Sequence, residues 1–301
     1  MPDNTIPLQS KIKRVTIPVL QGMKKRGEII CALSIYDAQH ARLFDEAGGD
    51  LIIVGDSAEM AVDGEPDTLT ATMERMADRV RSVKNGTKRL FVVADMPLGS
   101  YEVSDEEATR NALRLIKETR ANAVKAEINA PYISRIEAIA NACSVVAHIG
   151  LNPNKAEMLG GYRTLGKTEK SYRELAKIII EAEKAGACMI LIEAVTEEIS
   201  EKIRCEVKIP VIGIAAGRKL DGQLLISSDL LGLYQWPGNP PIHFEQYLTE
   251  RQGITIGESI LDAFKWYVKG VKEKRFPSDK HVHHASEEML RAMGLDNAGN
   301  E

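Results

Sequence analysis

The sequence has few cysteines, and their spacing excludes the usual disulfide and zinc patterns. Its four cysteines, Cys31, Cys143, Cys188 and Cys205, are scattered, and no two of them form a C-x-x-C pair. Disulfide frameworks and structural zinc sites normally show closely or regularly spaced cysteines. Three of the four lie in or beside apolar runs. We therefore predict buried, reduced thiols and no zinc centre.

Long apolar runs and a strong charge of one sign are also lacking. No apolar run approaches the ~20 residues that a membrane-spanning helix needs. The first residues show neither an apolar signal core nor an arginine-rich transit pattern. A formal net charge of -4 gives no electrostatic reason for binding nucleic acid or an anionic membrane. We expect a cytoplasmic protein that acts on small molecules.

What is present is a regular alternation of short apolar runs and longer amphipathic segments. Seven runs are rich in valine and isoleucine and apolar at successive positions, which is typical of parallel strands buried on both faces. An eighth run is weaker, and we place it near residues 230–234. The seven clear runs are residues 29–35, 51–55, 90–95, 123–127, 144–150, 189–194 and 210–216.

The segments between these runs are expected to be helices. Four of them are especially clear, and the second opens with Ser104 and Glu107 in capping-box spacing. Repeated strand–helix units without a linker predict one α/β domain over residues 1–301. An (α/β)8 TIM barrel, which takes ~250 residues, fits best, and a doubly wound open sheet is the alternative. The four clear helices are residues 37–48, 104–120, 169–186 and 196–207.

Both ends of the chain are expected to lie outside the strand–helix repeat. We predict a polar N-terminal extension over about residues 1–15 and a C-terminal helix and tail over about residues 256–301. The tail contains three histidines, His281, His283 and His284. Because the surrounding sequence is polar, we interpret this segment as a solvated tail rather than a metal site.

Acidic residues stand at the ends of four predicted strands. Asp56, Asp95, Glu127 and Glu193 each end or directly follow an apolar run. In an α/β barrel the C-terminal ends of the strands surround one mouth, where active sites form. A carboxylate buried there is costly unless it binds a cation or a hydrogen-bond donor. One such residue could cap a helix, but four of them favour a shared catalytic site.

The types of these residues indicate metal-assisted chemistry on a 2-oxo acid. Mg²⁺ needs only one or two carboxylate ligands, which Asp56 and Asp95 can supply. A metal there could hold the carboxylate and keto oxygens of the substrate and stabilise an enolate. Lys125 would add positive charge to the same oxygens. The residue pattern alone leaves either Glu193 or Glu127 as the base.

One motif imitates a nucleotide-binding loop. Residues 161–168, GYRTLGKT, satisfy the G-x-x-x-x-G-K-[ST] pattern of a phosphate-binding loop. That loop must come directly from a buried strand. Here the preceding residues form a polar stretch with Pro153. We therefore interpret this segment as part of a long loop over the barrel mouth.

Several motifs resemble one family in order and spacing. They include IVGDS (53–57), VVADMP (92–97), VKAE (124–127), GGYRTLG (160–166) and LIEAV (191–195). Together they are similar to ketopantoate hydroxymethyltransferase, also called 3-methyl-2-oxobutanoate hydroxymethyltransferase. The resemblance runs from about residue 16 to about residue 281.

The resemblance implies a fold and an assembly. It implies a phosphoenolpyruvate-mutase-like (α/β)8 barrel that forms a homo-oligomer, commonly a decamer. It also implies transfer of a hydroxymethyl group from methylenetetrahydrofolate to 3-methyl-2-oxobutanoate, which gives ketopantoate for pantothenate and coenzyme A synthesis.

The resemblance also implies residue roles. It implies Mg²⁺ bound at Asp56 and Asp95 with Glu127 nearby, and Glu193 as the base. Ser57, Asp95 and Lys125 would contact the 2-oxo acid, and we group His148, on the fifth predicted strand, with these substrate-binding residues.

The chain departs from the family pattern beside these residues, at positions Ala58, Glu59, Leu98, Ile128 and Asn129. We expect their side chains to form the wall of the substrate pocket or the layer behind it. These departures leave a second function as an alternative: a related metal–enolate enzyme, such as an aldolase or lyase, that acts on another 2-oxo acid. A catalytically silent scaffold is a further alternative, but it would have lost the metal or base residues.

Overall fold

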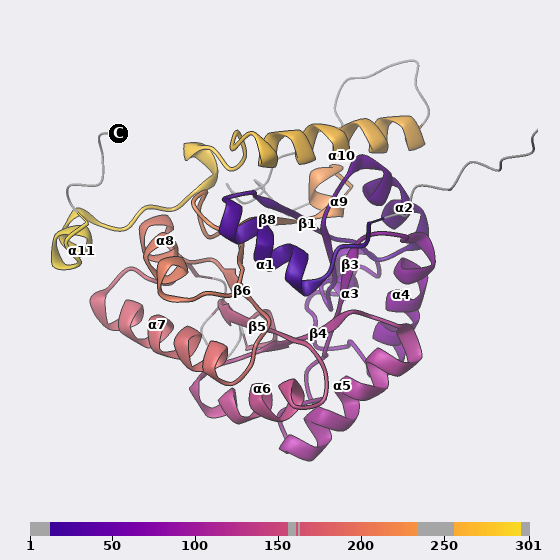
Figure 1. Ribbon diagram of the computed structural model, residues 1–301, viewed down its shortest axis with the longest axis horizontal. Helices are drawn as coiled ribbons and strands as arrows, with labels where there is room; N and C mark the ends of the chain where they lie inside the picture. The colour runs from indigo at the N-terminus through magenta and orange to yellow at the C-terminus, as the bar shows by residue number, and fades with distance from the viewer. Residues whose placement is uncertain (1–12, 156–160, 162, 234–255, 296–301) are drawn as a thin grey trace, which may run out of the picture.

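The computed structural model describes residues 13–155, 161, 163–233 and 256–295, and a closed barrel of eight parallel strands forms its centre (Figure 1). Each strand pairs with the next in the chain, and β8 pairs with β1 from Ile30–Gly222 to Ser34–Ile226. This closure confirms the TIM barrel and excludes the open sheet. The strands are β1 (Ile30–Ser34), β2 (Leu51–Val54), β3 (Phe91–Asp95), β4 (Ala123–Glu127), β5 (Val145–Gly150), β6 (Met189–Glu193), β7 (Val211–Ile214) and β8 (Gly222–Ile226).

The seven clear strands lie where the sequence predicts them, but the predicted position of the eighth is wrong. β8 begins at Gly222, whereas Leu230 ends the short helix α9 (Ser227–Leu230), and Tyr234 lies outside the described residues. A side chain at Gly222 would come within 2.7 Å of the Ile30 carbonyl oxygen, so close strand pairing requires glycine here. Glycine followed by the polar Gln223 weakens the apolar pattern of this strand.

Helices surround the barrel, and several of them begin at a capping side chain. Ser104 accepts a hydrogen bond of 3.1 Å from the Glu107 backbone amide, as the predicted N-cap requires. The helices are α1 (Ile17–Arg26), α2 (Ala38–Ala47), α3 (Ala58–Ala61), α4 (Met73–Gly86), α5 (Asp105–Thr119), α6 (Ile133–Ala140), α7 (Glu169–Lys184), α8 (Glu197–Glu206), α9, α10 (Ile256–Lys272) and α11 (Glu287–Ala292), with 3-10 turns η1 (Ala130–Tyr132), η2 (Pro153–Lys155) and η3 (Asp279–His281). A capping side chain precedes α2, α4, α5, α7 and α11.

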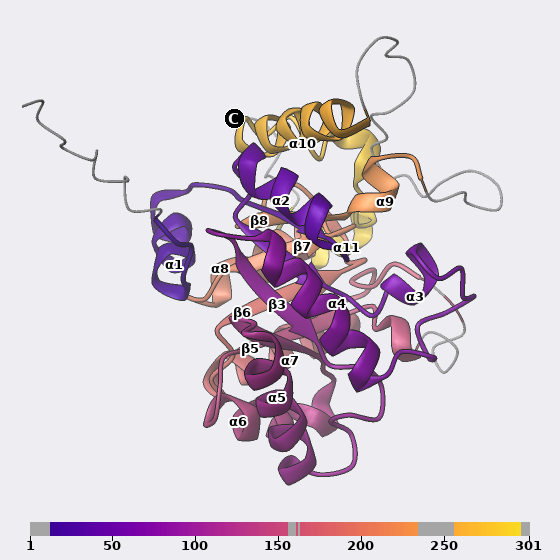
Figure 2. The same cartoon turned by 90° about the vertical axis from the view of Figure 1, so that its right-hand side faces the viewer.

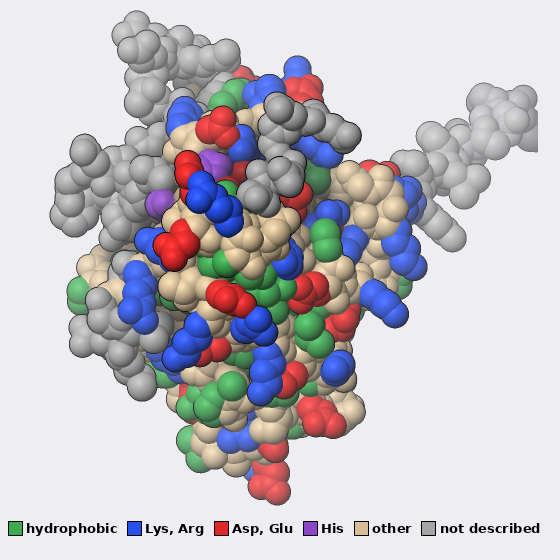
Figure 3. Space-filling view, turned by 90° about the vertical axis from the view of Figure 1, so that its left-hand side faces the viewer, with side chains coloured by type: hydrophobic (Ala, Val, Ile, Leu, Met, Phe, Trp, Pro, Cys, Tyr) green, Lys and Arg blue, Asp and Glu red, His purple; other side chains and the backbone are tan. Residues whose placement is uncertain are grey.

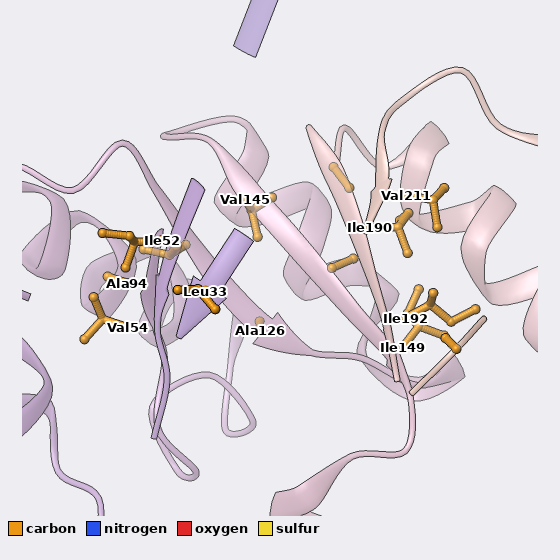
Figure 4. Close-up of a cluster of buried hydrophobic side chains, with 14 of the residues drawn as sticks. Leu33, Ile52, Val54, Ala94, Ala126, Val145, Ile149, Ile190, Ile192 and Val211 are labelled. Atoms are coloured by element: carbon orange, nitrogen blue, oxygen red, sulfur yellow. The ribbon is translucent and has the colours of Figure 1, made fainter. Parts of the chain in front are cut away.

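Alternating residues of each strand face two different apolar layers. Outward side chains such as Leu33, Ile52 and Ile190 pack against the helices (Figure 4). Inward side chains such as Phe91 and Val146 fill the barrel, and Leu20 of α1 packs against this inner set. Helix α1 therefore closes the N-terminal end of the barrel, opposite α3 and α9 (Figure 2).

The C-terminal segment packs against the barrel rather than extending into solvent. Phe264 of α10 meets Phe44 of α2 edge to face, with ring centroids 5.6 Å apart. His281 is buried, and its ring lies 5.1 Å from that of Phe276. The predicted solvated tail is therefore wrong at His281, because the apolar ring of Phe276 gives the imidazole a surface to cover. Residues 1–12 and 296–301 of the predicted extensions lie outside the described part.

The remaining surface features concern charge and cysteine. On the face shown in Figure 3, basic and acidic side chains are interspersed. Within the described ranges, no helix has both the length and the apolar character needed to cross a membrane. All four cysteines are free, and Cys31 is fully buried. Cys143 and Cys188 are partly buried and Cys205 is exposed on α8, so the predicted burial is complete at Cys31 and wrong at Cys205.

The Phe44–Phe264 contact should contribute strongly to stability. Replacing Phe44 by Ala removes a fully buried ring, and we expect a loss of ~3–5 kcal/mol in the free energy of unfolding. Urea denaturation followed by circular dichroism measures this change. Leu113→Ala, at a partly exposed position on α5, is the control and should change stability by ~0.5 kcal/mol or less. Equal losses in the two variants would contradict the packing described above.

Candidate active site

A cavity of about 590 Å³ opens at the C-terminal end of the barrel. Its volume falls within the ~300–1,000 Å³ typical of small-molecule sites. The structure brings all seven residues predicted from the sequence into its lining. They are Asp56, Ser57, Asp95, Lys125, Glu127, His148 and Glu193.

The strand register explains why these side chains meet. Asp95 on β3 is the Cα partner of Lys125 on β4, and Glu127 on β4 is the partner of His148 on β5. Partners in register on neighbouring strands point to the same side of the sheet. Strands β3, β4 and β5 therefore each direct a polar side chain inward at their C-terminal ends.

Lys125 lies at the centre of the polar cluster. Its Nζ is 2.8 Å from Asp95 Oδ1 and 3.2 Å from His148 Nδ1. Burial alone would lower the pKa of Lys125, but the carboxylates of Asp95, Asp56 and Glu127 together raise it. The side chain therefore carries a stable positive charge in the interior of the site.

The contact with Lys125 also determines the tautomer of His148. A lysine ammonium can only donate, so His148 Nδ1 accepts and Nε2 carries the proton. Burial lowers the pKa of His148, and the charge of Lys125 lowers it further, so the ring is neutral. Nε2 lies 3.1 Å from Glu193 Oε2, within hydrogen-bond reach although without the angle of a hydrogen bond in this structure.

A second group of polar residues holds the β2 end of the site. The Asp56 backbone amide donates to Asp95 Oδ2 at 3.1 Å, and Asn154 Nδ2 donates to Asp56 Oδ2 at 2.8 Å. The Tyr36 and Ser57 hydroxyl groups share a hydrogen bond of 2.9 Å. Sequence reasoning missed Tyr36 and Asn154. Tyr36 stands just after the first predicted strand, the same signal that identified the acids.

Burial shifts the acids of the cluster toward their neutral forms. It raises the pKa of Asp95 to about 7 against the opposing charge of Lys125. It raises the pKa of Glu127 well above its usual value, again against Lys125. The site thus collects more carboxylates than Lys125 can neutralise, and a further cation would stabilise their ionised forms.

The donor set fits Mg²⁺ held by few protein ligands. Both carboxylate oxygens of Glu127 are buried and have no hydrogen-bond partner among the described residues. Among the same residues, no group of three or more histidine, cysteine, aspartate or glutamate side chains is arranged so that it could bind a metal ion by itself. Mg²⁺ usually keeps several waters and binds through one or two carboxylates, so it does not need such a group.

The five positions that depart from the family pattern lie behind or away from the cavity. None of these residues is in its lining, so of the two predicted positions, the wall or the layer behind it, the wall is wrong. Glu59 lies in the layer behind: its amide donates to the Asp56 carbonyl, and its carboxylate pairs with Arg75 at 2.8 Å. Ile128 packs in the outer apolar layer, and Leu98 is exposed. The lining around the reacting groups is therefore untouched by these changes.

The loop that imitates a nucleotide-binding motif lies at the mouth. Arg163 and Thr164 line the cavity, and Leu165 forms an isolated parallel bridge with Val195 after β6. The described residues before it, Pro153–Lys155, form a 3-10 turn and no strand. This arrangement agrees with a loop over the mouth. His283 from the C-terminal segment also lines the cavity, and sequence reasoning assigned it no role there.

Comparison with known proteins identifies the family. A sequence model described as ketopantoate hydroxymethyltransferase matches residues 14–279. The chain belongs to this family. A 3-methyl-2-oxobutanoate hydroxymethyltransferase of Clostridium novyi (strain NT) is 41% identical over 276 residues, which cover 91% of this chain and 98% of that protein. One of Bacillus velezensis (strain DSM 23117 / BGSC 10A6 / LMG 26770 / FZB42) is 39% identical over 272 residues, or 90% and 95% of the two chains.

Solved structures confirm the barrel type. A phosphoenolpyruvate phosphomutase from Streptomyces platensis subsp. rosaceus aligns with a TM-score of 0.54 at 17% identity, over 72% of this chain and 83% of that one. A phosphonopyruvate hydrolase in complex with oxalate and Mg²⁺ aligns with a TM-score of 0.53 at 15% identity, over 69% and 79%. At these identities the likeness concerns the fold.

Burial should make the titration of Glu193 unusual. Burial raises its pKa to about 8; Lys125 opposes the shift and Asp56 adds to it. In the metal-free protein the carbonyl band of the neutral acid should therefore disappear only as the pH rises through about 8. Infrared difference spectra of the wild type minus Glu193→Gln would isolate this band. A midpoint near the ordinary glutamate value of 4.5 would contradict the environment described here.

Proposed function

We propose that this chain catalyses the transfer of a hydroxymethyl group to 3-methyl-2-oxobutanoate, which gives ketopantoate. Membership of the family and the names of relatives at 39% and 41% identity support this activity. The observation that carries the proposal is the position of Glu193. Its partly exposed carboxylate faces the same cavity as Lys125 and the buried acids.

The inner end of the cavity is proposed to bind the 2-oxo acid. Asp56 and Asp95 would hold Mg²⁺, with Glu127 close by. When bound, Mg²⁺ would supply positive charge to the carboxylate and keto oxygens of the substrate. The Lys125 ammonium, which is buried and permanently charged, would stabilise the negative charge that develops on the keto oxygen. Ser57, held by Tyr36, would donate a hydrogen bond to the substrate carboxylate.

Glu193 is proposed as the general base. It would remove the proton from C3 of the substrate, and the electron pair would move onto the C2 carbonyl as an enolate. The raised pKa makes the carboxylate a stronger base once it is ionised. His148, whose neutral ring places Nε2 within 3.1 Å of Glu193 Oε2, would donate to the carboxylate and hold it in position before and after proton transfer.

The carbon–carbon bond would form in the second half of the reaction. Methylenetetrahydrofolate is the proposed donor of the methylene carbon. A bond forms between C3 and this carbon, both carbon–nitrogen bonds to the donor break, and water supplies the hydroxyl oxygen. Tetrahydrofolate and ketopantoate leave. The reaction needs no oxidant or reductant.

The wider setting is proposed from the same family membership. We infer a single-domain chain over residues 1–301 that works in the cytoplasm as a homo-oligomer, commonly a decamer in the family, within pantothenate synthesis. The interspersed surface charges in Figure 3 support small molecules as its partners rather than nucleic acid.

The first chemical step can be tested without the donor. In D₂O with Mg²⁺, the wild type should exchange the C3 proton of 3-methyl-2-oxobutanoate, followed by nuclear magnetic resonance. Glu193→Gln keeps the shape but removes the proton acceptor, so exchange should fall at least ~10²-fold. Glu174→Gln, on the exposed face of α7, is the matched control and should exchange normally. No exchange by the wild type would refute the proposed function, and normal exchange in Glu193→Gln would transfer the base role to Glu127.

The metal role of Asp56 can be measured without activity. Asp56→Asn removes one carboxylate ligand, so Mg²⁺ binding should weaken at least ~10-fold. Even substitution of residues that only hydrogen-bond the metal ligands lowers metal affinity ~10–100-fold. Titration calorimetry of the purified protein with MgCl₂ gives the dissociation constant. Asp78→Asn, an exposed change on α4, should bind like the wild type. Unchanged binding in Asp56→Asn would remove this residue from the metal site.

A further inference from the structure

The C-terminal segment returns to the mouth of the barrel after α10. Figure 1 shows it running from the end of α10 past α8 to α11. Two hydrogen bonds fix it on the first turn of α8, one between backbone groups and one to a side chain. The Glu197 amide donates to the His283 carbonyl at 2.9 Å, and the Ala285 amide donates to Glu198 Oε2 at 2.8 Å. The segment is therefore held at His283 itself and at Ala285, two residues further along.

The loop that carries Arg163 is fixed to the same turn. The Leu165 amide donates to the Ala194 carbonyl at 2.7 Å, and the Thr196 amide donates to the Leu165 carbonyl at 3.1 Å. The next amide along the chain, that of Glu197, is the one that binds His283. Because successive Cα atoms are only 3.8 Å apart, the loop and the C-terminal segment lie close together on this turn.

Both segments contribute residues to the wall of the cavity. Arg163, Thr164 and His283 belong to its lining, together with Glu193 from the strand that precedes the turn. The cavity is larger than a five-carbon 2-oxo acid fills, and the proposed chemistry at its inner end uses none of these three side chains. They are available for a second substrate.

The charges around these residues favour an anion. Arg163 is exposed and positive. Burial lowers the pKa of His283, and the positive charge of Lys167 lowers it further. The nearest acids are already engaged: Glu197 pairs with Arg218 at 2.7 Å, and Glu198 pairs with His284 at 2.6 Å. Besides the acids of the proposed metal end, the lining contains Glu193, the proposed base, and Asp229.

We propose that His283 and Arg163 form an outer subsite that binds the anionic end of the one-carbon donor. This inference rests on the proposed function and deepens it. A folate donor carries carboxylates on its glutamate, and a guanidinium and an imidazole N–H can both donate hydrogen bonds to them. The family sequence model ends at residue 279, so His283 lies outside the pattern that defines the family. The C-terminal segment thus contributes a specificity-determining residue to the site.

The test compares two donors in steady-state kinetics. With methylenetetrahydrofolate, His283→Ala should raise the KM for the donor about tenfold, the size expected when a hydrogen bond to a charged group is lost, and kcat should change less than about twofold. Arg163→Gln should act in the same direction, and His283→Gln, which keeps a donor group, should recover part of the loss. With methylenetetrahydropteroate, which lacks the glutamate, His283→Ala and the wild type should have the same KM.

Controls separate a local binding role from a structural one. His284→Gln, on the neighbouring exposed residue, should leave the KM of both donors unchanged, and donor-free proton exchange should be normal in every variant. An unchanged KM in His283→Ala, or an equal rise with both donors, would overturn the subsite. Calorimetric binding of tetrahydrofolate tests the subsite even if the wild type shows no exchange: weaker binding to His283→Ala supports it, and equal binding refutes it.

Discussion

The buried ammonium of Lys125 is the interaction on which the site depends. It contacts Asp95 and His148 directly, and its charge acts on Glu127 and Glu193 as well. Without it, several carboxylates would share a buried space with no fixed opposite charge, which is a costly arrangement. The barrel makes the cluster possible because its strands point inward in register. Lys125 also fixes the tautomer of His148, so one side chain links the proposed metal end of the cavity to the proposed base.

The sequence is most informative where a residue's position follows from strand periodicity. Seven strands and six of the seven candidate site residues can be located in this way, because an acid at the end of a buried strand must find a cation or a hydrogen-bond donor there. Ser57 is assigned only through the family resemblance. Features that depend on contacts between distant segments cannot be predicted from strand periodicity. The position of β8 is missed because the Gly222 backbone must approach the Ile30 carbonyl across the sheet. The burial of His281 is missed for a different reason: the polar residues around it outweigh the one nearby aromatic ring, that of Phe276, on which it packs. Asn154 reaches Asp56 from 98 positions away.

The turn after β6 links Glu193, the proposed base, to the loop and the C-terminal segment at the cavity mouth. Ala194 has a φ of 50°, an uncommon value for a residue with a side chain, and the carbonyl of Ile214 and the amide of Leu165 hold it there. This turn begins one residue after Glu193 and carries both the mouth loop and the C-terminal segment. Changes in either segment therefore act on the backbone next to the proposed base, so that distant parts of the chain can influence one carboxylate.

Helix α1, which packs against the inner apolar set, leaves substrates to approach from the end where the acids lie. If the 2-oxo acid occupies the inner end of the cavity and the donor the outer end, the donor blocks the path of the acid. The kinetic scheme is then a compulsory-order one: the acid binds first, tetrahydrofolate departs before ketopantoate, and donor in excess traps any empty enzyme in a dead-end complex.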